Sequence, residues 1–127
     1  MDRYLIDSNV ISNYFSGIFS EKAVVFLSYV IDKLPTLSVV TKIEALSWRS
    51  ADMAKENIVR LFVHNSNIIA LSDIIVDECI EIRRNYKIKT PDAIIAATAI
   101  VYDFTLLTSD SDFNRIPSLK IINPFDL

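Results

Sequence analysis

Five short runs of the chain are largely apolar at consecutive positions, and each has the length of a β-strand. The runs are residues 4–6, 37–40, 68–71, 104–107 and 121–122. Apolar and polar residues do not alternate within them, which is typical of parallel strands that are covered on both faces. The pattern therefore predicts a buried parallel sheet.

The segments between these runs are long enough for helices, and their apolar residues recur at helical spacing. Helices are predicted at 8–16, 21–33, 42–49, 51–63, 73–85 and 91–103. Residues 93–102 include four alanines and are apolar nearly all round, as expected of a helix packed closely on a sheet. The repeated strand–helix–helix order predicts an α/β fold, a three-layer α/β/α domain with a central parallel sheet of about five strands.

Composition narrows the class of protein without naming a function. The 127 residues are 51% hydrophobic with a single glycine, so we expect one folded domain, residues 1–127. No apolar run approaches the roughly 20 residues that cross a bilayer, and the N-terminus lacks the apolar stretch of a signal peptide. The single cysteine, Cys79, lies among apolar residues and fits a packing role in a reducing compartment. We expect a cytoplasmic protein without membrane contact.

Four acidic residues stand where a segment expected to be buried gives way to a turn. They are Asp7, Glu44, Asp92 and Asp110. In a parallel sheet the carboxyl ends of strands and the amino ends of helices share one edge, where such folds bind ligands. Asp7 and Asp110 follow strands, and Glu44 lies in the first turn after the strand 37–40. The helix that Asp92 opens is about 18 Å long and the return strand climbs about 17 Å, so all four acids should reach this edge.

Each of these acids also has a purely structural interpretation. Thr41 and Glu44 have the spacing of a capping box. Asp92 follows a proline at a helix start, where a negative charge favours the helix dipole. Asp7 and Asp110 are suited to cap helices or form turns. Four acids at one edge favour a shared site, because independent caps would have to coincide there.

The motifs around these acids resemble the PIN domain family, and specifically its VapC-type toxins from toxin–antitoxin pairs. The resemblance runs from Met1 to about Pro124 and rests on Leu5-Ile6-Asp7-Ser8-Asn9-Val10-Ile11-Ser12, Thr41-x-x-Glu44, Pro91-Asp92-Ala93-x-Ile95-Ala96-Ala97-Thr98-Ala99 and Leu107-Thr108-x-Asp110-x-Asp112-Phe113. It implies a metal-dependent ribonuclease, usually a homodimer, that a cognate antitoxin inhibits. Its acidic quartet would be Asp7, Glu44, Asp92 and Asp110. Many relatives place the last acid directly before the Phe, so Asp112 is the alternative to Asp110, which we favour because it follows the strand directly.

The composition of the quartet indicates the metal. Carboxylate oxygens without a nearby His or Cys suit Mg²⁺ or Mn²⁺. A bound divalent ion lowers the pKa of a water ligand and neutralises charge on a phosphate, which is the chemistry of phosphodiester hydrolysis. Asp7, Asp92 and Asp110 are the predicted metal ligands, and Glu44 is a further ligand or orients the attacking water. Supporting roles around the metal are predicted for Ser8, Asn9, Thr108 and Asp112.

A basic stretch precedes Asp92 and is the candidate surface for RNA. It contains Arg83, Arg84, Tyr86, Lys87 and Lys89. These side chains are able to contact phosphates and stack on an unpaired base, although basic residues at a helix C-terminus also complement the helix dipole. Net charge is −3, so any nucleic-acid contact must be local. A mean hydropathy of +0.32 indicates apolar surface that a partner covers.

Two other functions compete with a ribonuclease. A receiver-type signalling domain would need a phosphoacceptor acid after the third strand and a lysine after the fifth, for which Asp73 and Lys120 are poor candidates. The second is a PIN-like module that binds RNA or an antitoxin, as part of a DNA-binding repressor complex, without cutting. An intact acidic quartet argues against this second alternative.

Overall fold

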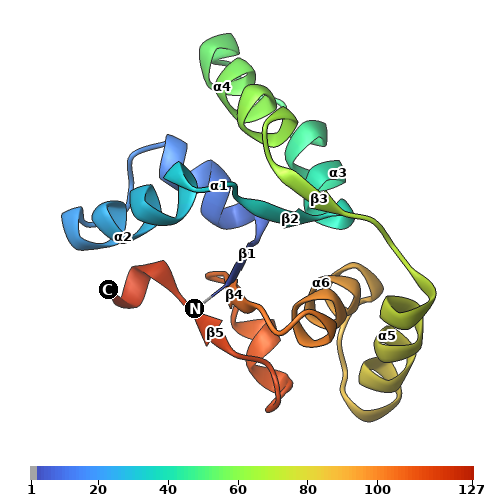
Figure 1. Cartoon of the computed structure of the whole chain (residues 1–127). Helices are drawn as coiled ribbons and strands as arrows, with labels where there is room; N and C mark the ends of the chain where they lie inside the picture. The colour runs from blue at the N-terminus through green and yellow to red at the C-terminus, as the bar shows by residue number, and fades with distance from the viewer. Residues whose placement is uncertain (1–2) are drawn as a thin grey trace.

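The computed structural model describes residues 3–127 and contains the predicted five-stranded parallel sheet. The strand order is β3-β2-β1-β4-β5, and every pair of neighbours is parallel (Figure 1). The strands are β1 (Tyr4–Ile6), β2 (Thr36–Ser38), β3 (Asn67–Ile69), β4 (Thr105–Leu107) and β5 (Ile121–Ile122). The α/β fold class and the parallel sheet are therefore confirmed.

Two α-helices follow each of the first three strands, as the sequence predicts. They are α1 (Ser8–Phe15), α2 (Glu21–Asp32), α3 (Val39–Ser47), α4 (Met53–His64), α5 (Asp73–Asn85) and α6 (Thr90–Val101). Two short 3-10 helices, η1 (Ser111–Arg115) and η2 (Pro124–Asp126), were not predicted. The first of them proves important because it follows β4, contains Asp112 and has Asp110 as its N-cap residue.

The two faces of the sheet pack against different sets of helices. Leu5 and Leu106 are fully buried in a cluster with residues of α5 and α6. Ile6 and Leu107, their neighbours along the strands, are buried in a second cluster with residues of α1 to α4. In Figure 1, α5 and α6 accordingly lie together on the side of the sheet away from α1 and α2. Side chains alternate between faces along a strand, so two covered faces require the continuous apolar runs seen in the sequence.

The start of α3 differs from the prediction. Val39 and Val40 were assigned to a strand, but the strand ends at Ser38, whose side chain accepts a hydrogen bond from the Val40 amide (3.1 Å) as the N-cap of α3. Thr41 is consequently a buried residue inside the helix. The capping box of Thr41 and Glu44 is therefore wrong, and Glu44 lies in the second turn of α3 instead of the first turn after the strand. β-branched residues favour strands, which is why the pair of valines was misassigned.

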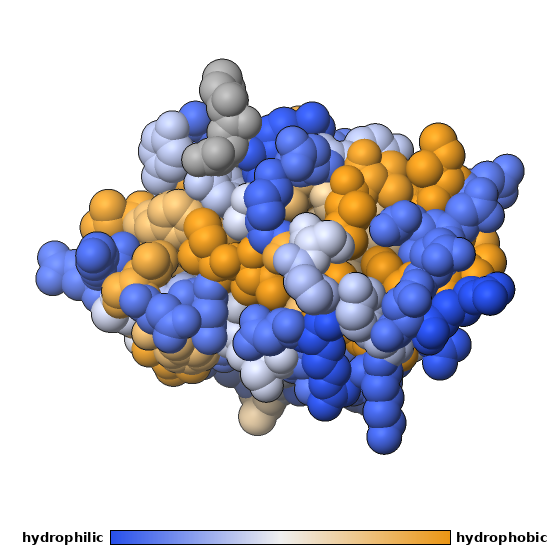
Figure 2. Space-filling model, turned by 90° about the horizontal axis from the view of Figure 1, so that it is seen from below, coloured by the Kyte–Doolittle hydropathy of each residue, from blue (hydrophilic) through white to orange (hydrophobic). Residues whose placement is uncertain are grey.

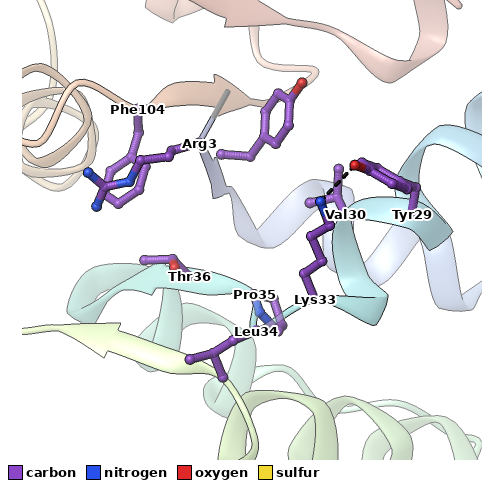
Figure 3. A pocket seen from close by; sticks show the side chains of 9 residues that line it. Arg3, Tyr29, Val30, Lys33, Leu34, Pro35, Thr36 and Phe104 are labelled. Atoms are coloured by element: carbon purple, nitrogen blue, oxygen red, sulfur yellow. Dashed lines mark hydrogen bonds between the residues drawn. The ribbon is translucent and has the colours of Figure 1, made fainter. Parts of the chain in front are cut away.

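A cavity of about 350 Å³ lies at the amino-terminal edge of the sheet, opposite to the edge that carries the predicted acids (Figure 3). The Arg3 guanidinium lies 4.6 Å from the centre of the Phe104 ring. Across the cavity, the Lys33 ammonium donates a hydrogen bond to the Tyr29 hydroxyl (2.7 Å). Both cations that line this cavity are therefore engaged with aromatic side chains.

Apolar side chains reach the surface in several places. On the face in Figure 2 they form separate patches among polar residues. Leu34, Val25 and Ile74 are each at least 67% exposed. The apolar surface that the mean hydropathy predicts is present. Within the described chain, none of the helices combines the length and the apolar character needed to cross a membrane.

Candidate metal centre

The acids lie at the point where the strand order of the sheet reverses. The chain moves from β1 to β2 and β3 on one side and then crosses to β4 and β5 on the other. The carboxyl ends of β1 and β4 are therefore neighbours, with Ile6 beside Leu107 and the Asp7 amide donating to the Leu107 carbonyl (3.0 Å). Such a reversal leaves a crevice in which parallel α/β sheets bind ligands.

Asp7 is a buried carboxylate held by three hydrogen bonds. It is 4% exposed, and it accepts from the Ser8 amide, the Asn9 side-chain amide and the Thr108 hydroxyl, each at 2.8 Å. Burial raises the pKa of Asp7 to about 6, with small further rises from the charges of Glu44 and Asp92, while the hydrogen bonds act in the opposite direction. Asp7 is thus both the N-cap of α1 and an ionisable group among other acids.

Asn9 and Thr108 join the ends of β1 and β4. The Asn9 side-chain oxygen accepts from the Ser109 amide (3.1 Å) and the Ser109 hydroxyl (3.0 Å). The Thr108 hydroxyl, besides donating to Asp7, accepts from the Asp110 amide (3.1 Å) and from Asn9 (3.3 Å). These bonds fix the positions of Asp7 and Asp110 relative to each other, which is the geometry expected of supporting residues.

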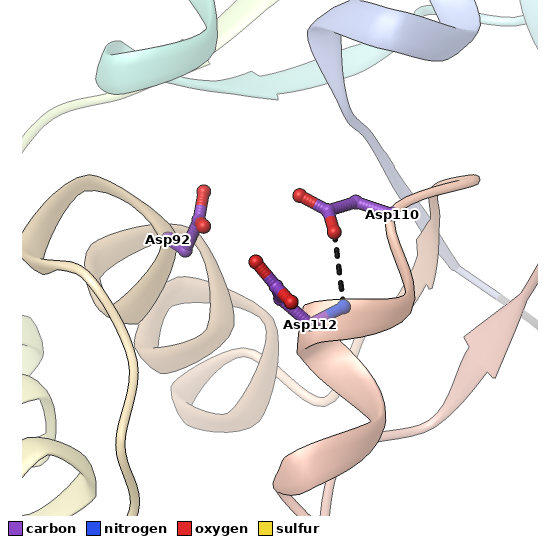
Figure 4. A group of neighbouring side chains, drawn as sticks. All are labelled: Asp92, Asp110 and Asp112. Atoms are coloured by element: carbon purple, nitrogen blue, oxygen red, sulfur yellow. Dashed lines mark hydrogen bonds between the residues drawn. The ribbon is translucent and has the colours of Figure 1, made fainter.

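Asp92, Asp110 and Asp112 form the tightest group of acids. One oxygen of each lies within 4.8 Å of the others, and Figure 4 shows the three side chains facing a common space, Asp92 from the start of α6, Asp110 from the residue before η1 and Asp112 from η1. Asp110 accepts a hydrogen bond from the Asp112 amide (2.9 Å) and so caps η1. Asp92 is 9% exposed, and its Oδ2 is buried without a hydrogen-bond partner. Burial raises the pKa of Asp92, and the charges of Asp110 and Asp112 add to the rise, while Lys89 opposes it. A buried carboxylate that has an oxygen without a partner and lies close to two further carboxylates is suited to a cation.

Glu44 lies beside this group from α3. The Ser8 hydroxyl donates to its carboxylate (3.3 Å). Burial raises the pKa of Glu44, the charge of Asp92 raises it further, and the charge of Lys89 lowers it. The structure therefore brings the four predicted acids to one edge of the sheet, and Asp112, the predicted alternative to Asp110, lies with them. Their roles as metal ligands or catalytic groups stay a prediction.

Arg115 is a residue of this region that the sequence analysis missed. Its guanidinium lies 3.5 Å from an Asp112 oxygen and donates to the Lys87 carbonyl (2.9 Å). It therefore links η1 to the loop between α5 and α6. The i,i+3 spacing of Asp112 and Arg115 is the signal that could have revealed the pair.

Some residues of the basic stretch make structural contacts, and one lies beside the acids. Arg83 and Arg84 are in the last turn of α5, as the dipole interpretation requires, and Arg83 donates to the Ile88 carbonyl (3.3 Å). Tyr86 is half-buried and packs against the α5–α6 cluster. Lys89 is the N-cap residue of α6, and its charge lowers the pKa of the neighbouring acids. Lys89 is thus placed beside the acids, and the role of the stretch in RNA binding stays a prediction.

Comparison with known proteins decides the family. The sequence profile described as the PIN domain matches residues 4–119. The chain belongs to the PIN domain family. Among curated proteins no relative matches the chain significantly. Membership of the PIN domain family excludes a receiver-type domain. Lys120 pairs with exposed Asp103 (2.7 Å), away from the acids.

Solved structures with the same fold cover nearly the whole PIN domain. A toxin–antitoxin complex from Klebsiella pneumoniae is 27% identical, with a TM-score of 0.76, covering 98% of this chain and 99% of that one. FitAcB from Neisseria gonorrhoeae is 24% identical, with a TM-score of 0.79 and the same coverage. DNA-bound VapBC from Salmonella typhimurium is 17% identical, with a TM-score of 0.77 and again the same coverage. The last two likenesses show the fold alone.

The buried Asp7 carboxyl predicts how the metal-free protein responds to pH. Its pKa is about 6 in the folded chain, above the 3.8 of an unperturbed Asp, so protonation favours the folded state. The stabilisation that comes from protonated Asp7 is fully present below pH 4 and is lost as the pH rises through 6. A pKa that is about two units higher in the folded chain corresponds to a change of about 3 kcal/mol in the free energy of unfolding. Urea unfolding in chelator, from pH 4 to pH 8, should show a fall in the free energy of unfolding.

Asp7→Asn is expected to make this fall smaller, although Glu44 and Asp92, whose pKa values are also raised, keep part of it. The readout is the slope of the free energy of unfolding against pH. Its absolute value is not compared, because Asn also loses hydrogen bonds at this position. Asp77→Asn, at an exposed position on α5, should keep the full slope. Parallel curves for wild type and Asp7→Asn would show that Asp7 does not titrate in this range.

Proposed function

We propose that this PIN domain is a Mg²⁺- or Mn²⁺-dependent endoribonuclease and the toxin of a VapBC-like toxin–antitoxin pair. The observation that carries the proposal is the meeting of Asp92, Asp110 and Asp112 within 4.8 Å, with a buried Asp92 oxygen that has no hydrogen-bond partner. The donor set contains carboxylate oxygens alone, which fits a hard divalent ion.

The acids would have different roles in hydrolysis. A bound Mg²⁺ supplies a water of lowered pKa and neutralises charge on the phosphate. Asp92 and Asp110 would hold the ion, with Asp112 as a third carboxylate, and the buried Asp7 would be a further ligand, directly or through water. Glu44 has a raised pKa and an exposed side chain, so it is suited to orient the attacking water and accept its proton.

The substrate we propose is single-stranded RNA. RNA cleavage is what the resemblance to VapC-type toxins implies, and the position of Lys89 beside the acids supports a phosphate contact there. Arg83, Arg84 and Lys87 carry further positive charge on the preceding turn and loop. These charges lie within an acidic chain, so they would direct the phosphate backbone to this edge of the sheet.

The partners we propose are a cognate antitoxin and a second copy of the chain, in the cytoplasm. The Klebsiella pneumoniae relative, 27% identical over almost the whole chain, is a toxin–antitoxin complex. On α5, Ile74 and Ile80 are more than half exposed, beside a cavity of about 600 Å³ that Val76 and Ile94 line. Apolar surface of this kind is suited to be covered in an assembly.

Metal-dependent cleavage tests the enzymatic part of the proposal. The purified protein is expected to cut single-stranded RNA with Mg²⁺ or Mn²⁺, to lose this activity in excess chelator, and to regain it when the ion is restored. The physical reason is that a group of carboxylates without the cation repels a phosphate. Full activity in chelator would contradict the mechanism. The readout is the appearance of cleavage products of an end-labelled RNA.

The second candidate is the module that binds without cutting. DNA-bound complexes among proteins of the same fold give this candidate its support. The same experiment separates the two functions. RNA that binds to the protein and stays intact with both Mg²⁺ and Mn²⁺ would favour the binding module.

A further inference from the structure

A small cavity lies directly beside the acids, between α1, α3 and α4. Its volume is about 150 Å³, and Ser8, Ser12, Glu44 and Trp48 contribute to its walls, with apolar side chains behind them. Glu44 belongs to this cavity and interacts with Asp92 and Asp7 through its charge. A group bound in the cavity would therefore be adjacent to the place where the acids act.

The chemistry of the walls indicates the kind of group that fits. Trp48 ends α3 and is half-buried, packed against the apolar cluster of α1 to α4. The Ser8 hydroxyl donates to Glu44 (3.3 Å), and the Ser12 hydroxyl donates to the Asn9 carbonyl (3.3 Å). Both hydroxyl protons are engaged, so these oxygens and the Glu44 carboxylate offer acceptors. An aromatic wall with acceptors around it matches a flat ring that carries N–H donors.

We propose that this cavity is a base-binding subsite in which Trp48 stacks on one unpaired base of the RNA, next to the phosphate that is cut. The inference rests on the proposed ribonuclease function and adds a specificity-determining residue to it. Protein aromatic side chains stack on bases that are splayed out of single strands, whereas paired bases are not available. The small volume and the continuity with the acids favour a base over a segment of a protein partner. The subsite therefore selects single-stranded over paired RNA.

Trp48 is the only tryptophan of the chain, so its fluorescence reports on the cavity directly. The full-length Asp92→Asn variant, which is expected to bind RNA without cutting it, is titrated in Mg²⁺ with fluorescently labelled single-stranded RNA, and binding is followed by anisotropy. Tryptophan emission of the same variant, measured with unlabelled RNA, should be quenched with the same midpoint as the anisotropy change. One abasic position in the RNA should remove most of the quenching. RNA that binds by anisotropy without quenching would overturn the subsite. Absence of binding by this variant, together with absence of cleavage by the wild type, would overturn both the subsite and the proposed function.

A matched pair of substitutions separates stacking from packing. Trp48→Phe keeps an aromatic ring, whereas Trp48→Leu keeps apolar bulk without one. Loss of a stacked base weakens binding by about tenfold, so Trp48→Leu should raise KM by about that factor at an almost unchanged kcat, and Trp48→Phe should stay near wild type. Melting temperatures of both variants establish that they fold, and Tyr102→Leu, at an exposed aromatic residue at the end of α6, should leave KM unchanged.

The kinetic outcomes distinguish this inference from the function on which it rests. Wild-type cleavage with equal KM values for Trp48→Leu and Trp48→Phe would overturn the subsite and leave the ribonuclease in place. A tenfold gap in KM between the two variants, with equal stability, would support the subsite.

Discussion

Asp92→Asn is expected to reduce the Mg²⁺-dependent cleavage of single-stranded RNA by about 10³-fold or more. The substitution keeps the size of the side chain and one oxygen, but it removes the negative charge from the buried group that faces Asp110 and Asp112. A divalent ion that loses a charged ligand binds more weakly and positions the phosphate less well. The measurement is the initial rate of cleavage at saturating Mg²⁺.

Expression of the wild type should also arrest growth, and expression of Asp92→Asn should be tolerated.

The control for this prediction is Asp77→Asn. Asp77 is an exposed acid on α5, so its removal changes the net charge by the same amount as Asp92→Asn without touching the acids at the sheet edge. Its cleavage rate and its effect on growth should match those of the wild type. Cleavage by Asp92→Asn at the wild-type rate would show that the group of three acids is not the catalytic centre.

The arrangement of strands and helices was predictable because two covered faces leave a simple pattern in the sequence. The strand Tyr4–Ile6 and the helix Asp73–Asn85 have the predicted bounds. The start of α3 was not predictable, because two valines after a strand favour its continuation, and the N-cap role of Ser38 depends on where the strand ends. Helix η1 was missed because five residues are too few to show a periodicity.

The positions of Asp7, Asp92 and Asp110 followed from topology, since strand ends and helix starts meet at one edge. That Asp112 lies beside Asp110 and Asp92, and is not simply an alternative to Asp110, did not follow from topology, because it depends on the turn that η1 makes after β4. Caps and a shared site were treated as alternatives, but Asp7 and Asp110 cap helices and also lie among the acids. At Asp110 both are possible because one oxygen of the carboxylate accepts the capping bond while the other is available to a neighbour. The Asp110 cap uses Oδ1 alone.

Asp92→Asn should also make the metal-free protein more stable, by about 1 kcal/mol after solvent screening. The negative charges of Asp110 and Asp112 destabilise an ionised Asp92, and its buried oxygen has no hydrogen bond to lose. The side-chain amide of Asn is also able to donate to these neighbours. For a chain of this length the melting temperature in chelator should rise by about 4 °C. A gain of stability on this substitution would indicate that function has been favoured over stability at Asp92.

Mg²⁺ should reverse this order of stability. An ion that binds the folded state alone stabilises it by about 2.7 kcal/mol at a hundred times its dissociation constant. Wild type should therefore gain several degrees with millimolar Mg²⁺, whereas Asp92→Asn should gain much less. Thermal unfolding of both proteins, with chelator and with Mg²⁺, provides the four melting temperatures that are compared.

Asp110 allows the capping role to be separated from the charge in the same experiment. Asp110→Asn keeps an oxygen for the Asp112 amide, so it should be as stable as wild type in chelator or more so. Asp110→Ala loses the cap and should be less stable by about 1 kcal/mol. Neither variant should gain the full stabilisation from Mg²⁺. If Mg²⁺ shifted none of these proteins and Asp110→Asn were clearly less stable than wild type in chelator, Asp110 would be a structural cap. The proposed ribonuclease would then lose its main physical support, because the convergence of Asp92, Asp110 and Asp112 would no longer indicate a cation.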